Sequence, residues 1–535
     1  MIQIFCQNVA RALVAGALCA LGAMATAQTG EWSDPNLNYS YFRQSWNTQG
    51  RKWMEEYGGL KWNEGSKKWV LDEAWTHAQT DVAQQAYTME LAAQVGVDSG
   101  AGCHDLSLLN ELAEYFLAFS NRFTTLAALQ QRATSMKANS ALLKAQGAPS
   151  ARTLTWVEQT PTGLRVRECT LCNAQAFHPI ARLLRVIAAL PASQRGAAIT
   201  KFVEVYTPLL VHDHLLRLLY EADPNRAKEL PKTLVDIWRV VPGTKTRPKR
   251  AWDYALQDTD LYLIATSAEM LGANAADPRL VPLSPDEKSK LRVAVQAGVK
   301  FLQSKRTLYK DTKDFKGRVV GSTSYFNGDF TGHPDMAYAG YDGKALPRPE
   351  DKHDNPNASW DISHAYRLPV FMRSMYDNRA ATGTDFPMTE DVNLLVNQYV
   401  YRAFRGDFSQ PQFNNFLDGS DGWYRVGYHG GQSGYAPAPD CDMHDASRLC
   451  LTPGNVMAWG ELNLFSADLD KLELSIAQVA FSQDSKVQAF RERYYWYNSE
   501  HYVGVGAKGE PEYPLLMLFV LGENASRLKG CTDQH

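Results

Sequence analysis

Helical periodicity constrains this chain of 535 residues more than any other feature. Apolar residues recur at positions i, i+3, i+4 and i+7 in successive runs, with polar breaks between the runs. This spacing predicts helices over residues 73–95, 106–136, 177–190, 198–221, 253–271, 285–302, 360–378, 392–404, 456–465, 469–481 and 485–499. Only one strand pair is indicated, a hairpin of residues 153–157 with 164–166. We therefore expect a mainly α protein with at most a minor β-hairpin.

The N-terminus has the pattern of a secretory signal. Residues 12–25 form an apolar run of small residues and Leu, too short to span a bilayer comfortably. The sequence Ala25-Thr26-Ala27 follows, which is a typical cleavage site. We expect residues 1–27 to be a signal peptide and the protein to be periplasmic or secreted. No later segment has the roughly 18 apolar residues that a membrane span needs, so we expect none.

Six cysteines remain after that signal: Cys103, Cys169, Cys172, Cys441, Cys450 and Cys531. An even number in an exported chain favours disulfides. Cys441 and Cys450 would close a short loop and are the expected pair. Cys169 and Cys172 leave three alternatives open, namely a tight bridge, a redox pair or half of a metal site. A structural disulfide is favoured, because no second CxxC completes a four-thiolate zinc site.

Size and charge limit the architecture and the partners. Residues 28–535 exceed what one simple core usually holds. We expect one large helical catalytic domain over that range, with 28–245 as a candidate helical subdomain. The formal net charge of −3 argues against a nucleic-acid partner. Aromatic residues are abundant at 11%, and many lie in Gly- and Asp-rich stretches where they would be free to stack on ligands.

The segment 357–369 places several polar side chains at the start of a predicted helix. Helical spacing puts Trp360, His364 and Arg367 on one stripe, with Asp361 within reach of His364 through an i, i+3 step. The alternative is purely structural. In that case Asp361 caps the helix, and His364 and Arg367 tie it to a neighbour.

These residue types suit acid–base chemistry. A carboxylate beside an imidazole orients it and raises its basicity, so Asp361 and His364 could act together as a general base. Tyr366 could donate a proton, and Arg367 could clamp a carboxylate or sulfate in a bidentate manner.

A second group of candidates lies in the long segment 405–455, which has many Gly, Asp and aromatic residues and little periodicity. Its carboxylate could act as acid, base or nucleophile, and its rings suit stacking on sugars. The alternative is an ordinary loop, since Asp and Gly are common turn residues. The candidates here are Asp421, Trp423, Tyr424, Arg425, Tyr428 and His429.

The sequence predicts no metal and no cofactor. Residues 440–445 are rich in oxygen ligands but match no EF-hand pattern, so a solvated disulfide loop is favoured there. His212 and His214 are two residues apart and would point to different faces of a helix, which favours packed histidines over metal ligands.

Trp recurs with acidic neighbours at predicted helix starts, as in Trp252-Asp253, Trp360-Asp361 and Trp459-Gly-Glu461. Together with export, helix density and aromatic loops, this architecture resembles the helical-toroid enzymes that act on polysaccharides. That resemblance implies an (α/α) toroid or barrel with long aromatic-rich rim loops and a sugar cleft at one rim. Trp252 would then bind substrate there. Residues 258–265 look like an acidic inner-helix motif of certain toroidal endoglucanases. Their Ile-Ala pair lies one residue later than in that motif, so we do not carry over its catalytic assignment.

The expected substrate is a polysaccharide or oligosaccharide. Glycoside hydrolysis by a pair of carboxyl groups is favoured by the near-neutral charge, with Asp361, Asp421 and Glu461 as candidates. A polysaccharide lyase or uronate epimerase that uses His364, Tyr366 and Arg367 is the first alternative. A glycan-binding protein without catalysis is the second, and the distances among the three carboxylates would help to separate them.

Overall fold

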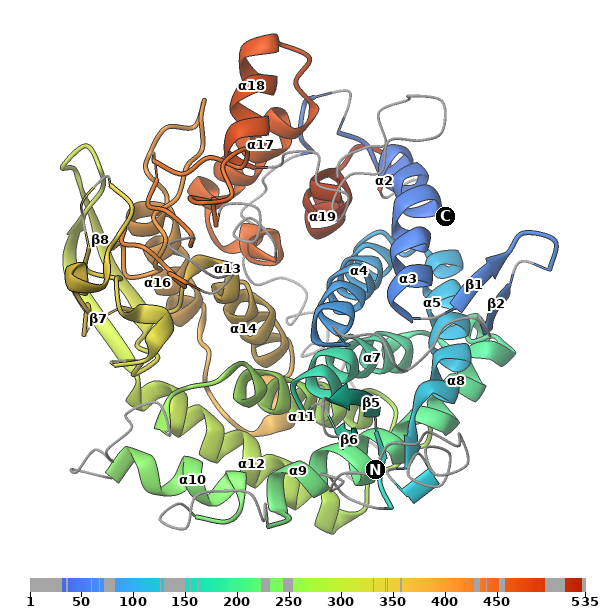
Figure 1. The fold of residues 1–535 in the computed structure, drawn as a ribbon. Coiled ribbons are helices and arrows are strands. Elements are labelled where there is room, and N and C mark those ends of the chain that lie inside the picture. The colour runs from blue at the N-terminus through green and yellow to red at the C-terminus, as the bar shows by residue number, and fades with distance from the viewer. Residues whose placement is uncertain are drawn as a thin grey trace, which may run out of the picture.

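The computed structural model confirms that the chain is mainly helical (Figure 1). It describes residues 31–34, 37–58, 60–66, 68–71, 82–125, 127–128, 150–153, 155–160, 163–168, 170–222, 231–243, 254–330, 332–341, 343, 345–356, 358–427, 434–438, 440–451, 458–495 and 515–531. The expected signal peptide, residues 1–27, lies outside these ranges. None of the described helices is long and apolar enough to cross a membrane.

Most predicted helices are present, with shifted ends. They are α4 (Val82–Gly102), α5 (Leu106–Phe119), α7 (Thr170–Ala189), α8 (Ala197–Pro208), η4 (Leu209–Leu216), α9 (Arg217–Tyr220), α11 (Asp258–Ala276), α12 (Pro285–Ser304), α13 (Ile362–Ala365), α14 (Arg367–Asp377), α16 (Thr389–Gln398), η9 (Tyr399–Ala403), η11 (Trp459–Phe465), α17 (Ala467–Phe481) and α18 (Ser485–Tyr494). The periodicity did not predict α2 (Tyr39–Ser45), η1 (Trp46–Gly50), α3 (Arg51–Gly58), α10 (Leu234–Val240), α15 (Arg379–Thr382) or α19 (Leu515–Glu523). Several of these are too short to show a repeating apolar pattern.

Six helical segments pack in succession around the middle of the molecule. Helix α4 contacts α7, α7 contacts α11, and α11 contacts α14. Helix α14 then contacts η11, η11 contacts α19, and α19 returns to α4. Figure 1 shows α4, α7, α11 and α14 side by side, with α5, α8 and α12 farther from the middle. The helices that meet in this way bring residues from both halves of the chain together.

Within the described part of the chain, four antiparallel strand pairs lie among the helices, three more than predicted. The expected hairpin is present as β5 (Thr155–Thr160) and β6 (Gly163–Glu168). The others are β1 (Leu60–Asn63) with β2 (Lys68–Leu71), β3 (Thr124–Thr125) with β4 (Arg152–Thr153), and β7 (Arg306–Lys313) with β8 (Val319–Phe326). The longest of these additional hairpins is β7–β8, for which the sequence pattern predicted neither a helix nor a strand. Most of β7 is exposed or only half-buried, so it lacks the apolar alternation that identifies a strand.

The described residues contain one short-range and one long-range disulfide for which both cysteines are placed. The predicted bond between Cys441 and Cys450 is present. A second bond joins Cys103, just after α4, to Cys531 near the C-terminus. Cys172 is also disulfide-bonded, and Cys169 lies outside the described residues.

The first and last described segments meet near the Cys103–Cys531 bond. The backbone N–H of Trp32 donates to the Arg527 carbonyl, and that of Tyr39 donates to the Lys529 carbonyl. The disulfide therefore closes almost the whole described chain into a loop, at a sequence separation of 428 residues.

Removing this long-range disulfide should destabilise the protein more than removing the short one. Replacing Cys103 and Cys531 by Ser frees a loop of 428 residues in the unfolded chain, and we expect a loss of about 2–5 kcal/mol in the free energy of unfolding. The matched control replaces Cys441 and Cys450, whose separation is 9 residues. Urea unfolding of both double variants measures the difference, and an equal or larger loss in the control would contradict the account.

Candidate functional site

Among the predicted site residues, Asp361 and His364 are in direct contact. The imidazole Nδ1 of His364 lies 3.0 and 2.9 Å from the two carboxylate oxygens of Asp361. Asp361 is 3% exposed, while the His364 side chain is 24% exposed. The carboxylate therefore holds Nδ1 of the ring, while part of the His364 side chain stays exposed.

The local chain explains this pair. Asp361 has an extended backbone and is the N-cap of α13, where its carboxylate accepts a hydrogen bond from the His364 backbone N–H at 3.2 Å. Asp361 is therefore both the helix cap of the structural alternative and the partner of His364 in the proposed pair. The prediction that Trp360 shares one helix face with His364 and Arg367 is wrong, because Trp360 precedes the N-cap and lies outside the helix.

The Asp361 carboxylate is kept ionised. Burial alone would raise its pKa, but the His364 imidazole, the Ser363 hydroxyl and the charge of Arg425 lower it to about 2. Because the carboxylate is charged, the ring N–H on Nδ1 donates to it. In its neutral form His364 then carries its lone pair on Nε2.

Two residues of the long loop join the pair. Tyr424 hydrogen-bonds to Asp361, and its ring lies edge-on to the His364 ring at 6.2 Å between centroids. Burial and the nearby Asp361 charge hold the pKa of Tyr424 well above its ordinary value. Arg425 binds Asp335 through Nε at 2.8 Å, and its charge also acts on Asp361.

Backbone hydrogen bonds fix the loop against the start of α13. The Ile362 N–H donates to the Asn415 carbonyl, and the Leu417 N–H donates to the Trp360 carbonyl. The Arg425 N–H donates to the Asp335 carbonyl. Segments that are separate in the sequence therefore assemble one cluster, which we call the Asp361 cluster: Asp335, Asp361, Ser363, His364, Tyr424 and Arg425.

Tyr366 and Arg367 lie in a different, deeper network. The Tyr366 hydroxyl donates to Glu90 of α4 at 3.2 Å and lies 3.0 Å from the Tyr262 hydroxyl of α11. Arg367 is 3.3 Å from Asp258. Burial raises the pKa of Glu90 to about 8 despite the charge of Arg367. Tyr366 is fully buried. Its role as a proton donor stays a prediction.

Glu461 lies in a separate layer of the interior. Its carboxylate binds Arg182 of α7 at 3.0 Å, and Arg182 also binds Asp98 of α4 at 2.6 Å. Asp98 follows Glu90 by eight residues on the same helix, which places the two layers about 12 Å apart along α4. Tyr366 and Glu461 therefore belong to different levels of the helical interior.

Asp421 stabilises the loop that carries Tyr424. One oxygen accepts from the backbone N–H groups of Asn415 and Ala438, and the other binds Arg405 at 3.0 Å. Burial raises the pKa of Asp421 to about 7, although Arg405 and these hydrogen bonds oppose the shift.

The predicted aromatic platforms are mostly enclosed. Trp360 and Trp423 are 2% and 1% exposed, and Trp360 lies edge-on to Phe330. Their rings pack inside the described structure, so a stacking role stays a prediction. Trp252, Tyr428 and His429 lie outside the described residues.

Sequence reasoning missed several contributors to these networks, among them Asp335, Glu90 and Tyr262. Asp335 lies in a segment without periodicity, and only the fold brings it to Arg425. Glu90 and Tyr262 lie inside regular helices. Each is a polar residue on an otherwise apolar helix face. The sequence alone cannot distinguish such a buried polar residue from one at an exposed position.

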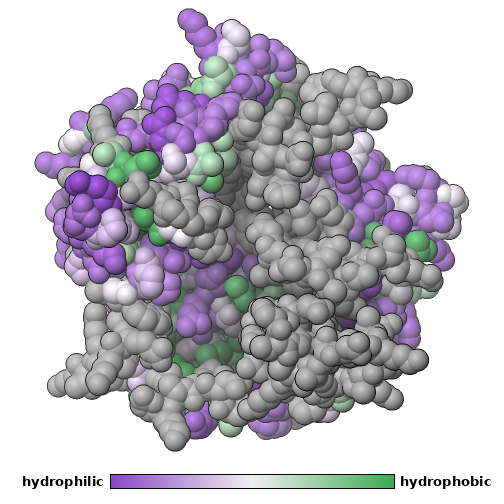
Figure 2. Space-filling view, viewed as in Figure 1, coloured by the Kyte–Doolittle hydropathy of each residue, from purple (hydrophilic) through white to green (hydrophobic). Residues whose placement is uncertain are grey.

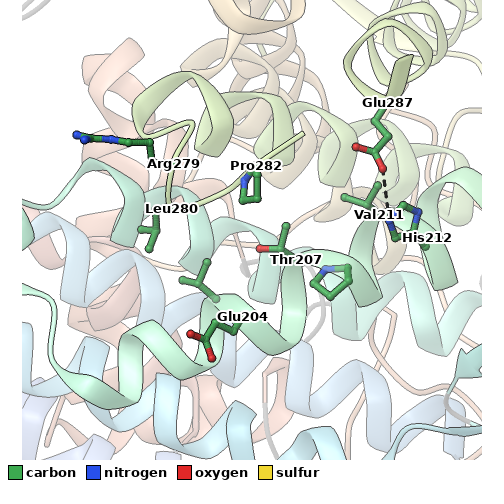
Figure 3. A pocket seen from close by; sticks show the side chains of 10 residues that line it. Glu204, Thr207, Val211, His212, Arg279, Leu280, Pro282 and Glu287 are labelled. Atoms are coloured by element: carbon green, nitrogen blue, oxygen red, sulfur yellow. Dashed lines mark ion pairs between the residues drawn. The ribbon is translucent and has the colours of Figure 1, made fainter. Parts of the chain in front are cut away.

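The surface offers little further guidance to the site. Figure 2 shows the face of Figure 1 hollowed near its middle, with both hydrophilic and hydrophobic residues in the hollow. A separate groove of about 390 Å³ lies between α8, η4 and the start of α12 (Figure 3). There His212 pairs with Glu287 at 3.3 Å. His214 does not line the groove and is buried against Phe177. The groove contains none of the predicted site residues.

No protein-family model, curated protein or solved structure matches this chain. Within the described ranges, no three His, Cys, Asp or Glu side chains gather in an arrangement that could hold a metal ion. Assignment of a function therefore depends on the geometry of the Asp361 cluster.

The Asp361 charge should contribute to stability in a pH-dependent way. Its folded pKa of about 2 is below the ordinary 3.8, so the contribution is present above pH 4 and is lost as the pH falls toward 2. Asp361→Asn keeps an N-cap acceptor but removes the charge. We expect it to cost about 2 kcal/mol at neutral pH and less near pH 2, as measured by urea unfolding. A cost that does not change with pH would contradict this origin.

Proposed function

We propose that this protein is an exported enzyme that breaks down a polysaccharide, with His364 as the general base. The observation that carries the proposal is the Asp361–His364 pair, in which a buried, ionised carboxylate holds Nδ1 of an imidazole whose side chain is 24% exposed. This is the arrangement that a base needs at neutral pH, because the ring is oriented and its free nitrogen can accept a proton.

The helices would form the (α/α) toroid that the sequence resemblance implies. The succession of contacts from α4 through α7, α11, α14, η11 and α19 back to α4 supports this arrangement. The Asp361 cluster lies at the N-terminal end of α13 and α14, in keeping with a site at one rim.

The chemistry favoured by this cluster is β-elimination on a uronate-containing chain. His364 Nε2 would take the C5 proton of the uronate, a C4–C5 double bond would form, and the C4–oxygen bond would break. The leaving oxygen takes up a proton, which the imidazolium of His364 can return. The positive charge of Arg425 beside the pair would stabilise the negative charge that develops on the uronate carboxylate.

Paired carboxylates are less well placed for hydrolysis. Asp361 is ionised at neutral pH and cannot act as the general acid. Glu461 binds Arg182 in the interior layer of Asp98. Asp421 is the observation that keeps hydrolysis as the second candidate, since a carboxyl with a pKa near 7 can donate a proton at neutral pH.

The decisive experiment is an activity screen on neutral and uronic-acid polysaccharides, with reducing ends and absorbance near 235 nm followed in parallel. Elimination predicts both signals on a uronate polymer, because the new double bond absorbs. Replacing the base should reduce the rate by a factor of about 10²–10⁴ in His364→Asn. His212→Asn, in the outer groove, is the matched control and should keep the full rate.

Other outcomes would indicate a different function. Reducing ends without absorbance would favour hydrolysis, and Asp421→Asn would then be the variant to test. Saturable glycan binding without either signal would instead indicate a binding protein.

A further inference from the structure

The short disulfide between Cys441 and Cys450 closes a loop next to the Asp361 cluster. Both cysteines are buried, each with 2% of its surface exposed. The two arms of the loop also meet beyond the disulfide, where the Ala436 N–H donates to the Leu449 carbonyl at 2.9 Å. Leu449 directly precedes Cys450, so the disulfide and this hydrogen bond hold the same part of the chain.

Three backbone segments run side by side at this point. Tyr435 forms a parallel bridge with Leu449 and an antiparallel bridge with Tyr424. In the antiparallel bridge, the Tyr424 N–H donates to the Tyr435 carbonyl at 3.0 Å, and the Tyr435 N–H donates to the Tyr424 carbonyl at 2.9 Å. Tyr435 therefore links the disulfide loop to Tyr424.

Tyr424 is the member of this contact that reaches the proposed base. Its side chain hydrogen-bonds to Asp361, and its ring lies edge-on to that of His364. Only 3% of Tyr424 is exposed. A tyrosine side chain has two torsions, so a fixed backbone and an enclosed ring together determine where the hydroxyl lies. The position of the Tyr424 backbone therefore matters for the contact with Asp361.

The length of the disulfide loop favours a local role for this bond. The entropy that a disulfide removes from the unfolded chain grows with the size of the loop that it closes. Cys441 and Cys450 are separated by 9 residues, against 428 for the pair Cys103 and Cys531. The short bond therefore has the smaller effect on overall stability, while it lies one residue from the contact between Leu449 and Tyr435.

We propose that the Cys441–Cys450 disulfide is a positioning element of the Asp361 cluster. Through Leu449 and Tyr435, it keeps Tyr424 in hydrogen-bonding contact with Asp361. The disulfide itself does not touch the substrate. Its effect on catalysis rests on the proposed function, but the placement of Tyr424 can be measured without any substrate.

The first test replaces Cys441 and Cys450 by Ala in the full-length mature protein, because Ala adds no hydroxyl at these buried positions. Carbon NMR of protein labelled on the tyrosine rings follows the ionisation of Tyr424, with Tyr424→Phe used to assign its signal. Burial and the Asp361 charge hold the pKa of Tyr424 well above its ordinary value, so the wild-type side chain should stay protonated at about pH 10.

In the alanine pair, Tyr424 should separate from Asp361, and its pKa should fall toward the ordinary value. Ionisation would then be visible at about pH 10. The pair Cys441→Ser and Cys450→Ser is closer in size to cysteine and is the second variant, should the alanine pair fail to fold. A folded variant in which Tyr424 stays protonated as in the wild type would overturn the proposal.

The matched control replaces Cys103 and Cys531 by Ala. This change removes the other disulfide and should cost more stability, yet it should leave the titration of Tyr424 unchanged in the folded protein. An equal fall in the pKa of Tyr424 in this control would show a general loosening of the fold and would contradict the assignment.

The second test measures kinetics on a polysaccharide that the wild-type protein cleaves. Tyr424 acts on the Asp361–His364 pair, so the alanine pair should lower kcat by about tenfold or more with little change in KM. An unchanged kcat in a variant whose Tyr424 has moved would contradict the positioning role. A wild-type protein inactive on every polysaccharide would contradict the proposed function alone, because the titration still decides whether the disulfide places Tyr424.

Discussion

The buried carboxylate of Asp361 is the interaction on which the rest of the site depends. It caps α13, holds the His364 ring and accepts from Ser363, and Tyr424 bonds to it from a distant loop. A charge buried in this way is tolerated only when several donors surround it. The same requirement that stabilises the helix start therefore fixes the orientation of the imidazole, so local structure and proposed chemistry have a common cause.

The interior of the helical assembly is polar at two levels. Near the start of α14, Glu90 meets the hydroxyl of Tyr366, and about 12 Å farther along α4 Asp98 meets Arg182. An ion pair such as Asp98–Arg182 contributes little net stability when intact, but removing one partner leaves a buried charge, at a cost of about 3–5 kcal/mol. Because a broken pair costs much more than an intact pair contributes, interior polar groups can determine which helices pack together. They need not take part in catalysis to do so.

Local patterns predicted the local features. Apolar periodicity identified the long helices such as α11 and α12, and the i, i+3 step from Asp361 to His364 predicted their contact correctly. The same step could not decide between a cap and a catalytic pair, and the structure contains both. Periodicity failed for β7, whose surface is mostly exposed and so carries no alternating apolar signal.

Features that arise from tertiary contacts could not be predicted from the sequence. Tyr424 and Arg425 join Asp361 because backbone hydrogen bonds place the loop on the start of α13, and no spacing rule encodes that docking. The sequence makes Glu461 a candidate, with Asp361 and Asp421, for the carboxyl pair of a glycoside hydrolase. The fold instead directs Glu461 toward Arg182, which only the packing of η11 near α7 determines.

The central claim is that Asp361 holds His364 with Nε2 available as a base, and the protonation of the ring tests it most directly. Nitrogen NMR of protein labelled at histidine, with His364→Asn used to assign the signals, reports which ring nitrogen carries the proton. The account predicts that neutral His364 is protonated at Nδ1 and bare at Nε2, and that Asp361→Asn weakens this preference. A proton on Nε2 in the wild-type protein would contradict the account, because the edge proposed to accept the substrate proton would already be occupied.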